Sequence, residues 1–399
     1  MPPPSTLLVF DAEPSGHHPD YVRYLLDALP EPQQAARVTL AVAQEMLDAH
    51  PDLVLSGAHL SPLSPQRPGN EIVAGSSRLW AQLCEAVRTH RPDAVLLLYG
   101  EMLLPDLARG ARLPGHPGIA TLHFRLPVRD AGPSFRERLR DVVKRRLLHR
   151  LFRHPDVKAL FSLDPRPVPE LRRMARHTSV VTLPDPVPNP TLTPEERADA
   201  RRRLRESLGL GPDHRLMVLF GALDSRKGIF ETLAAVRQLP PATAERLAVL
   251  FAGSLNPAIA ESFTADLVAT AAATPAHLTL RDGFIRDEHE VEEILGSADT
   301  VLIPYLRHVG SSGVLIRAAR LQTPVVCQAY GLMGAWTREH ALGRAVDTTN
   351  TAALAAALAE AVDDPVGAFD PVSAAAFAAP LTPAAFAAGL FGGLAPSMW

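Results

Sequence analysis

Short hydrophobic runs alternate with longer segments of mixed polarity along most of the chain. Continuous apolar runs separated by helix-length segments are typical of strands buried in parallel sheets. The pattern therefore predicts an α/β fold. The predicted strands lie at residues 7–11, 38–43, 94–99, 119–124, 159–163, 180–183, 216–221, 249–252, 278–280, 300–304 and 324–327.

A proline-rich segment divides these runs into two series. Residues 184–190 contain four prolines in seven positions, and such a segment cannot continue a helix or a central strand. We expect two Rossmann-like domains, at 1–188 and 189–375, and a final segment, 376–399, whose helix packs back on the first domain. Thr193 with Glu196 has the capping-box pattern, which predicts a helix from there to about Leu208.

Length and composition agree with two packed domains. The chain has 399 residues, of which 47% are hydrophobic, and its formal net charge of −3 offers no global basic field for nucleic acid. Cys84 and Cys327 lie in no CxxC or Cys/His cluster, so we expect neither a disulfide scaffold nor a zinc site. No stretch has the pattern of a signal peptide or a spanning helix. We expect a cytoplasmic protein.

One loop combines small residues with a helix start. The sequence PYLRHVGSSGVLIRAA runs from residue 304 to 319, and we expect a strand to end at its proline and a helix to begin near Ser311. Gly310 and Gly313 would let the backbone approach a ligand closely, and the free N–H groups of a helix start suit a diphosphate. An ordinary serine cap with tight packing would give the same pattern.

A second loop carries two cations after a predicted strand. Arg226 and Lys227 lie in FGALDSRKGI, residues 220–229. Positive side chains at the carboxyl end of a strand can hold phosphate oxygens. A solvated basic pair is the alternative, and the two loops together favour a phosphate site.

These two segments resemble the donor domain of retaining family 4 glycosyltransferases, also called glycosyl transferases group 1, over residues 205–345. The resemblance implies the GT-B fold, in which two Rossmann-like domains face each other across a cleft. It implies that Lys227 contacts the diphosphate of a nucleotide-sugar donor. It also implies that Ser311, Ser312 and Gly313 contact the diphosphate and the sugar.

Three positions depart from that family's pattern. Val309 and Arg317 stand where the family often carries two glutamates, and Ala222 stands where it often has arginine. A carboxylate accepts hydrogen bonds from ribose hydroxyls, whereas arginine accepts none. Nucleoside binding therefore differs, or Arg317 serves the phosphates, or the enzyme is degenerate. Arg226 is a candidate replacement for the missing arginine.

The first half supplies candidates for the sugar and acceptor side. Gly16, His17 and His18 follow the first strand and resemble the family's glycine-rich loop near the transferred sugar; plain loop residues are the alternative. His123 ends a strand and resembles the family's histidine beside the sugar, although a structural histidine would fit the pattern too. Glu101 follows another strand and is a candidate by position. We take His123 and His18 as the predicted catalytic residues.

Residues 135–153 combine eight Lys and Arg with two acids. Phe135, Leu139, Val142, Val143 and Leu147 share one predicted helical face. A basic amphipathic helix of this kind can lie on an anionic membrane surface. A helix packed by its apolar face, with its arginines in water, is the equal alternative.

The resemblance implies a retaining, metal-independent glycosyltransferase without a cofactor. The donor would be a nucleoside-diphosphate sugar, and the acceptor a hydroxyl of a glycan, lipid or small molecule in glycan or glycolipid synthesis, such as that of the cell envelope. Two alternatives remain open from the sequence. A nucleotide-sugar epimerase on the same fold would convert the donor without an acceptor, and a non-catalytic nucleotide-sugar-binding protein would bind it without turnover.

Overall fold

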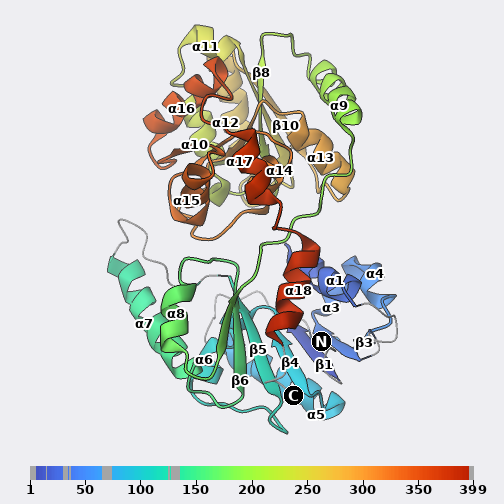
Figure 1. The fold of residues 1–399 in the computed structure, drawn as a ribbon. Coiled ribbons are helices and arrows are strands. Elements are labelled where there is room, and N and C mark those ends of the chain that lie inside the picture. Colours follow the sequence, from blue (N-terminus) through green and yellow to red (C-terminus); the bar gives the residue numbers. More distant parts are fainter. Residues whose placement is uncertain are drawn as a thin grey trace. The chain divides into compact units, whose positions relative to one another are not determined.

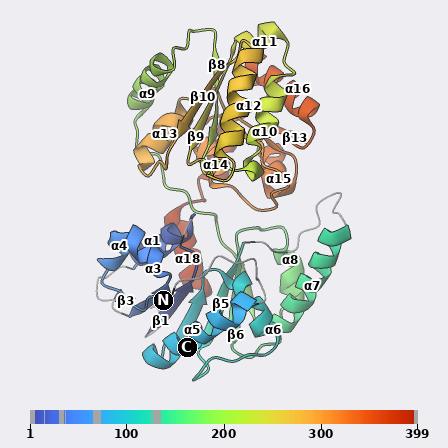
Figure 2. The ribbon, with the colours of Figure 1, turned by 180° about the vertical axis from the view of Figure 1, so that it is seen from behind.

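The chain forms two compact units, which are described separately (Figures 1 and 2). The computed structural model describes residues 6–14, 16–29, 35, 37–64, 74–124, 126 and 135–394, with backbone alone for 74–76 and 135–137. The first unit combines Met1–Pro186 with Pro383–Trp399, and the second is Val187–Thr382. The sequence placed these boundaries at 188 and 376. The helix Pro371–Ala378 accounts for the second difference, because its Phe377 lies in a core of the second unit.

The first unit contains a seven-stranded sheet in the order β3-β2-β1-β4-β5-β6-β7. Every strand pairing in the described part of this sheet is parallel. The central strands are buried along their whole length because helices cover both faces. The strands are β1 (Leu7–Asp11), β2 (Val38–Val42), β3 (His59–Leu60), β4 (Ala94–Leu97), β5 (Gly118–His123), β6 (Val157–Ser162) and β7 (Ser179–Thr182).

Two apolar clusters lie on opposite faces of this sheet. One joins it to α1, α3, α4 and α18, and the other joins it to α5, α6, α7 and α8. The bounds are α1 (His18–Asp27), α3 (Gln44–Ala49), α4 (Pro51–Val54), α5 (Ala74–His90), the 3-10 helix η1 (Gly100–Met102), α6 (Leu104–Ala108), α7 (Phe135–Leu151), α8 (Val168–Met174) and α18 (Pro383–Gly393).

The last helix, α18, belongs to the core of the first unit although the chain reaches it through the second. It lies beside α1 in both views (Figures 1 and 2). Phe386 and Leu390 are fully buried there, and the ring of Phe386 stacks on Tyr21 at 5.0 Å. The first unit is therefore assembled from two distant parts of the sequence.

The second unit contains a six-stranded parallel sheet in the order β10-β9-β8-β11-β12-β13. Its strands are β8 (Arg215–Phe220), β9 (Leu247–Gly253), β10 (His277–Asp282), β11 (Thr300–Ile303), β12 (Val325–Gln328) and β13 (Gly343–Val346). The 3-10 helix η2 (Ser225–Lys227) follows β8. Its helices are α9 (Pro194–Ser207), α10 (Ile229–Val236), α11 (Pro241–Glu245), α12 (Ala260–Ala273), α13 (Glu288–Gly296), α14 (Gly313–Arg320), α15 (Gly331–Glu339), α16 (Thr351–Asp363) and α17 (Pro371–Ala378).

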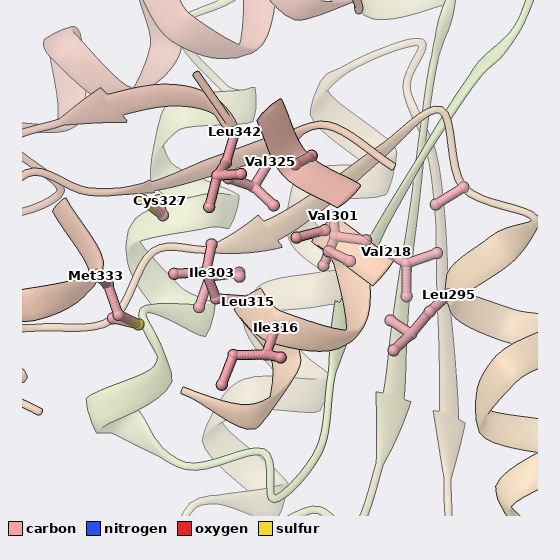
Figure 3. Packing of buried hydrophobic residues seen from close by; sticks show 14 of the residues in the cluster. Val218, Leu295, Val301, Ile303, Leu315, Ile316, Val325, Cys327, Met333 and Leu342 are labelled. Carbon is pink, nitrogen blue, oxygen red and sulfur yellow. The ribbon is translucent and has the colours of Figure 1, made fainter. Parts of the chain in front are cut away.

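Helices again cover both faces of the second sheet. The cluster on one face includes residues of α13, α14, α15 and α17, and that on the other includes residues of α10, α12 and α16. Figure 3 shows the first cluster, in which Leu315 and Ile316 of α14 pack near Ile303 at the end of β11. This packing fixes the start of α14 beside the carboxyl end of β11, where the sequence predicts a ligand loop.

A local sequence signal explains where α9 begins. Thr193 and Glu196 form the predicted capping box, with both of its hydrogen bonds, at the start of α9.

Among the described residues no single helix has the length and apolar composition to cross a membrane. The bent pair α17 and α18, with 41° between the two helices, meets the criteria of length and composition but shows nothing further.

Candidate functional site

In each sheet the order in which successive strands are added reverses once, at the switch point. Ligands of open α/β sheets bind there, at the carboxyl ends of the strands. In the first unit β1 and β4 are neighbours although β2 and β3 come between them in sequence. In the second unit the corresponding neighbours are β8 and β11. The loops that leave these four strands carry most of the residues singled out in the sequence.

In the second unit the two candidate loops meet through Tyr305. Lys227 from the loop after β8 donates a hydrogen bond to the Tyr305 hydroxyl, and its ammonium lies 3.9 Å from the centre of that ring. Ser312 Oγ donates to the same hydroxyl at 3.5 Å. The structure thus brings Lys227 and Ser312, predicted from separate motifs, to one phenol group.

A glycine makes this close approach of the two loops possible. Gly228 has φ of 72°, and a Cβ atom built on it would lie 2.1 Å from the carbonyl oxygen of Pro304. Any side chain at this position would force the loops apart. A backbone hydrogen bond of 2.8 Å from Leu306 to the carbonyl of Arg226 then closes the contact.

The small-residue loop is also held from the side of β12. The amide nitrogen of His308 donates to Gln328 Oε1 at 3.0 Å, and the side-chain nitrogen of Gln328 donates back to the His308 carbonyl. Nε2 of His308 lies 2.9 Å from the Ser311 carbonyl and donates to it. The loop that carries Gly310 and Ser311, both partly exposed, is therefore fixed before any ligand binds.

Helix α14 begins at Gly313, two residues later than expected. Ser312 is its N-cap residue, with extended backbone and no side-chain hydrogen bond to the helix. Its hydroxyl contacts Tyr305 instead. Tyr305 thus connects the ammonium of Lys227 to the N-cap residue of α14. The ammonium and the free N–H groups at the start of that helix are both suited to phosphate oxygens.

The side chains of the two arginines predicted at the donor site pair with carboxylates of the second unit. The guanidinium of Arg226 is largely exposed and pairs with Asp224 at 2.6 Å. Arg317 forms a two-pronged ion pair with Glu288 at the start of α13. Neither side chain joins the Lys227–Tyr305–Ser312 cluster, because each has a carboxylate partner of its own.

Arg317 and Glu288 line a cavity of about 50 Å³ between α13, α14 and the segment that opens the second unit. Val187, Val291 and Leu295 provide apolar walls. Arg320 reaches the same cavity, and burial followed by the nearby charge of Arg317 lowers the pKa of its guanidinium. No residue of the loops after β8 or β11 lines this cavity.

In the first unit the loop after β1 places a histidine against an aspartate. His18 Nδ1 lies 2.6 Å from Asp11 Oδ2, and both residues are buried, at 5% and 1% exposure. Asp11 ends β1 and His18 begins α1, so the strand-to-helix turn itself creates the pair. Gly16 has φ of 70° in that turn and is exposed, as is His17.

Aromatic rings surround His18 at this strand end. His17 stacks on it at 4.8 Å, and the rings of Tyr99 and Phe124 lie 5.1 Å and 5.5 Å away. Tyr99 follows β4 and Phe124 follows β5. The predicted residues His17 and His18 therefore lie at the switch point of the first sheet, not in a detached loop.

His123, the last residue of β5, is buried without a hydrogen-bond partner. It is 1% exposed, and among the described residues neither ring nitrogen has a partner. Burial lowers the pKa of His123 to about 4; the charge of Glu101 opposes this shift and that of Lys144 adds to it. The ring is therefore neutral at pH 7. Since buried polar groups are nearly always paired, each ring nitrogen is open to a hydrogen-bonding partner from outside the described residues.

Residues of η1 and α7 complete the surroundings of His123. Glu101 Oε1 lies 3.8 Å from Lys144 Nζ. A Cβ atom built on Gly100 would lie 1.7 Å from Thr121 Oγ1 and 3.0 Å from His123 Nε2, so only glycine fits there. The predicted acceptor-side residue Glu101 is thus near His123, held by a lysine that the sequence did not connect with it.

Helix α7 differs from the amphipathic pattern expected. Leu148 and Leu151 are its fully buried residues, whereas Leu139, Val142 and Val143, expected on one packed or membrane-facing side, are 55%, 46% and 49% exposed. The expected face also included Leu147, which is half-buried against the core, and Phe135, whose side chain lies outside the described residues. Only the last turns of this helix therefore pack against the core.

Sequence reasoning missed two residues that organise these sites. Tyr305 was part of a quoted motif, but nothing in the sequence showed that its hydroxyl would meet Lys227 and Ser312. Asp11 offered a signal, because it is a carboxylate at the end of a strand that is otherwise apolar. Such a residue must find a partner when buried.

Two parallel sheets of this order, each covered by helices on both faces, define the GT-B fold class. Residues 200–375 match the family described as glycosyl transferases group 1. This match covers most of the second unit, and the resemblance found in the sequence is confirmed. No curated protein matches the chain in sequence.

Solved structures show the same fold over nearly the whole chain. HepE of Anabaena, in complex with UDP and glucose, has a TM-score of 0.69 at 14% identity, covering 98% of this chain and 99% of that one. WaaG, a glycosyltransferase of lipopolysaccharide biosynthesis, has 0.65 at 15%, with 97% and 98% covered. Sucrose-phosphate synthase of Thermosynechococcus elongatus has 0.64 at 16%, with 98% and 94% covered. The predicted GT-B fold class is confirmed.

Proposed function

We propose that this protein transfers a sugar from a nucleoside-diphosphate sugar to an acceptor hydroxyl, with retention of the anomeric configuration. The observation that carries the proposal is the meeting of Lys227 and the start of α14 at the switch point of a group 1 glycosyltransferase domain. A glycan, a lipid or a small molecule would serve as acceptor. Retention rests on the family resemblance.

Leaving-group stabilisation follows from the geometry of the second unit. Negative charge grows on the diphosphate as its bond to the sugar breaks. The ammonium of Lys227 and the free N–H groups of α14 at Gly313 are fixed donors for that charge, so the proposed reaction needs no bound metal and no cofactor. Tyr305 holds Lys227 and Ser312 in place before the donor arrives.

A uridine nucleotide is the donor we propose to test first. HepE of Anabaena, which shares the fold, is described with UDP, with UDP and glucose, and with UDP-glucose. Such distant likeness establishes the fold alone, so the nucleotide is a proposal for this chain. Arg317 cannot accept hydrogen bonds from ribose hydroxyls. Its partner Glu288 has a carboxylate, which can accept them.

The neutral ring of His123 suits the sugar side of the reaction. Because neither ring nitrogen is paired among the described residues, the ring can donate one hydrogen bond and accept another, as sugar hydroxyls require. A protonated, positively charged ring would repel the positive charge that develops on the sugar during transfer. Burial, which keeps the ring neutral, therefore serves the proposed chemistry.

Thermal unfolding in the presence of nucleotides tests this proposal. A ligand that binds the native state raises its melting temperature. UDP, UDP-glucose, GDP and GDP-mannose should be compared with the nucleosides alone. We expect a rise with one diphosphate and its sugar, and none with the nucleoside. A chain that no nucleoside diphosphate stabilises would contradict the donor site.

Product analysis separates transfer from the alternatives. An epimerase would convert the nucleotide sugar alone into a second nucleotide sugar, without release of nucleoside diphosphate. A binding protein would be stabilised by the donor but would release nothing in the presence of acceptors. A transferase should release nucleoside diphosphate and form a glycoside whose anomeric proton coupling reports retention.

We further propose that α7 brings the first unit to an anionic membrane. Leu139, Val142 and Val143 are exposed at helical spacing, and exposed arginines flank them at 140, 146 and 150. Apolar side chains that enter the interface together with cations that meet anionic lipid are the requirements for surface binding. An acceptor attached to lipid would fit this placement.

A further inference from the structure

The pair formed by Asp11 and His18 fixes the orientation and tautomer of an imidazole at the switch point of the first sheet. Asp11 Oδ2 lies 2.6 Å from His18 Nδ1, and Asp11 Oδ1 accepts the amide hydrogen of Glu13 at 3.0 Å. An ionised carboxylate can only accept hydrogen bonds. In the neutral ring Nδ1 therefore carries the hydrogen, and Nε2 presents a lone pair.

The surroundings of His18 fit a sugar ring. Among the described residues no polar group is hydrogen-bonded to Nε2. The rings of Tyr99 and Phe124, each partly exposed, lie 5.1 Å and 5.5 Å from His18. A sugar has an apolar face that packs on aromatic rings and hydroxyl groups at its edge that need polar partners. Both kinds of partner are present here.

We propose that Asp11 holds His18 so that Nε2 accepts a hydrogen bond from the attacking hydroxyl of a sugar acceptor, whose ring packs on Tyr99 and Phe124. His18 is then a catalytic residue, because it touches the reacting oxygen. Asp11 is a positioning residue that acts through His18. The inference rests on the proposed function and adds to it the class of acceptor.

The bonds of the proposed step balance without a further reactant. The acceptor O–H bond breaks, and the acceptor oxygen forms a bond to the anomeric carbon. The bond between that carbon and the diphosphate oxygen breaks, and its electron pair leaves with the nucleoside diphosphate. The proton passes to the departing oxygen, as a same-face reaction allows. His18 directs the hydroxyl while this happens and keeps no proton.

A purely structural role for the pair predicts a different response to substitution. If His18 only braces the turn after β1, its bond to Asp11 is what matters. His18→Asn keeps an amide N–H near the position of Nδ1, whereas His18→Gln places an amide oxygen near the position of Nε2. The structural role favours asparagine, and the proposed role favours glutamine.

Turnover with simple glycosides distinguishes the two roles. The full chain would be given UDP-glucose with methyl α- or β-D-glucopyranoside, and UDP release would be compared with release to water. We expect at least one glycoside to increase release. Asp11→Asn and His18→Asn should lower that increase at least about tenfold, the scale of one lost hydrogen bond to a charged or positioned group. UDP binding, which we place at the loops of the second unit, should stay within about twofold of the wild type.

The glutamine variant is the matched control. His18→Gln should retain more glycoside-dependent release than His18→Asn, with both variants melting near the wild-type temperature. The reverse order, or an unchanged rate in Asp11→Asn, would overturn the proposal. If UDP-glucose binds but neither glycoside increases release, the sugar acceptor is wrong. If no nucleoside diphosphate binds, the proposed function fails instead.

A spectroscopic readout tests the same pair without any donor. In protein labelled with ¹⁵N-histidine, the imidazole nitrogens report which one carries the hydrogen. We expect His18 to show hydrogen on Nδ1 and to shift when methyl glucosides are added. Asp11→Asn should lose the tautomer preference. Hydrogen on Nε2 in the wild type, or no shift at tens of millimolar glycoside, would refute the assignment.

Discussion

Lys227 contacts both the ring and the hydroxyl of Tyr305, and that position determines what its removal should do. Lys227→Met keeps an apolar side chain of similar length but removes the charge that would face the diphosphate. We expect nucleoside-diphosphate binding to weaken by about 1–3 kcal/mol, the scale of a lost hydrogen bond to a charged group. Isothermal titration with the diphosphate identified by thermal unfolding gives the number.

Arg226 provides the comparison within the same loop. Its guanidinium already pairs with Asp224 and is largely exposed, so Arg226→Met should cost less binding energy than Lys227→Met. Equal losses would mean that ligand binding draws Arg226 away from Asp224. An unchanged affinity in Lys227→Met would remove this lysine from the donor site.

His123 should make the stability of the protein depend on pH. Its pKa is about 4 in the folded chain, whereas an unfolded histidine titrates near 6.5. Below 6.5 the unfolded chain gains a proton that the folded chain does not. The stability from the neutral ring is therefore complete above pH 6.5 and falls as pH drops towards 4, by about 3 kcal/mol in total.

His123→Leu removes this proton-linked loss while it keeps the site apolar. Denaturant unfolding of both proteins at pH 7, 5.5 and 4 measures the difference. We expect the wild type to lose stability relative to the variant over that range. Parallel curves would show that the folded protein takes up the proton on His123 as easily as the unfolded chain.

The sequence identified side chains at the sites better than it identified their partners. Lys227 and Ser312 were predicted as donor residues, and they meet at one hydroxyl, but that role for them remains a prediction. Arg317 was assigned to the donor on the ground of position alone. Its actual partner, Glu288, lies 29 residues earlier, and no local pattern encodes an ion pair between two helices. Residue spacing does not predict which side chains tertiary packing will bring together.

At the level of elements, apolar runs predicted the strands well because both sheets are covered on both faces. All eleven predicted runs overlap strands of the structure. The two strands that were missed, β3 and β13, are edge strands, and neither is fully buried. A strand that packs on one side needs no continuous apolar run, so its sequence does not stand out.

Helix α7 shows the opposite case, in which an apolar pattern does not mean burial. Because Leu139, Val142 and Val143 face solvent, we predict that the chain binds vesicles containing anionic phosphatidylglycerol and not vesicles of phosphatidylcholine alone. Each Lys or Arg near an anionic surface contributes about 1 kcal/mol, and salt screens this attraction within roughly 8–10 Å. Co-sedimentation should therefore fall as salt rises.

Two variants of α7 test the charged and apolar parts separately. Changing Arg140, Arg146 and Arg150 to glutamate should abolish binding, and changing Leu139, Val142 and Val143 to serine should weaken it at every salt concentration. Lys144 and Arg145 are left intact because they pair with Glu101 and Glu170. Glutamates at Arg78, Arg91 and Arg176, exposed arginines outside α7, match the net charge and should leave binding almost unchanged. Equal losses in both charge variants would contradict a specific docking face.

At the scale of the whole molecule, the two units differ in how many segments of the chain they contain. The second unit is one continuous stretch, Val187–Thr382, with apolar clusters on both faces of its own sheet. The first unit takes its last helix from beyond the second. The packing of Phe386 on Tyr21 was not readable from spacing, because the two positions are 365 residues apart (386 minus 21).

This difference predicts how the two units behave when they are separated. Residues 187–382 should fold alone and bind the nucleoside diphosphate within about tenfold of the full chain, since the candidate donor loops all lie within that stretch. Residues 1–186 should not fold alone. Loss of α18 removes the fully buried Phe386 and Leu390, and burial of each such side chain is worth about 2–5 kcal/mol. Together these losses rival the 5–15 kcal/mol that stabilises a typical domain.

Joining residues 383–399 to 1–186 through a flexible linker should restore folding, as measured by cooperative thermal unfolding. Phe386→Ala in that linked protein should abolish folding again. A stable fragment 1–186 would show that α18 is dispensable to the first unit, and an excised 187–382 that folds without binding nucleotide would show that the donor site needs more than the loops after β8 and β11.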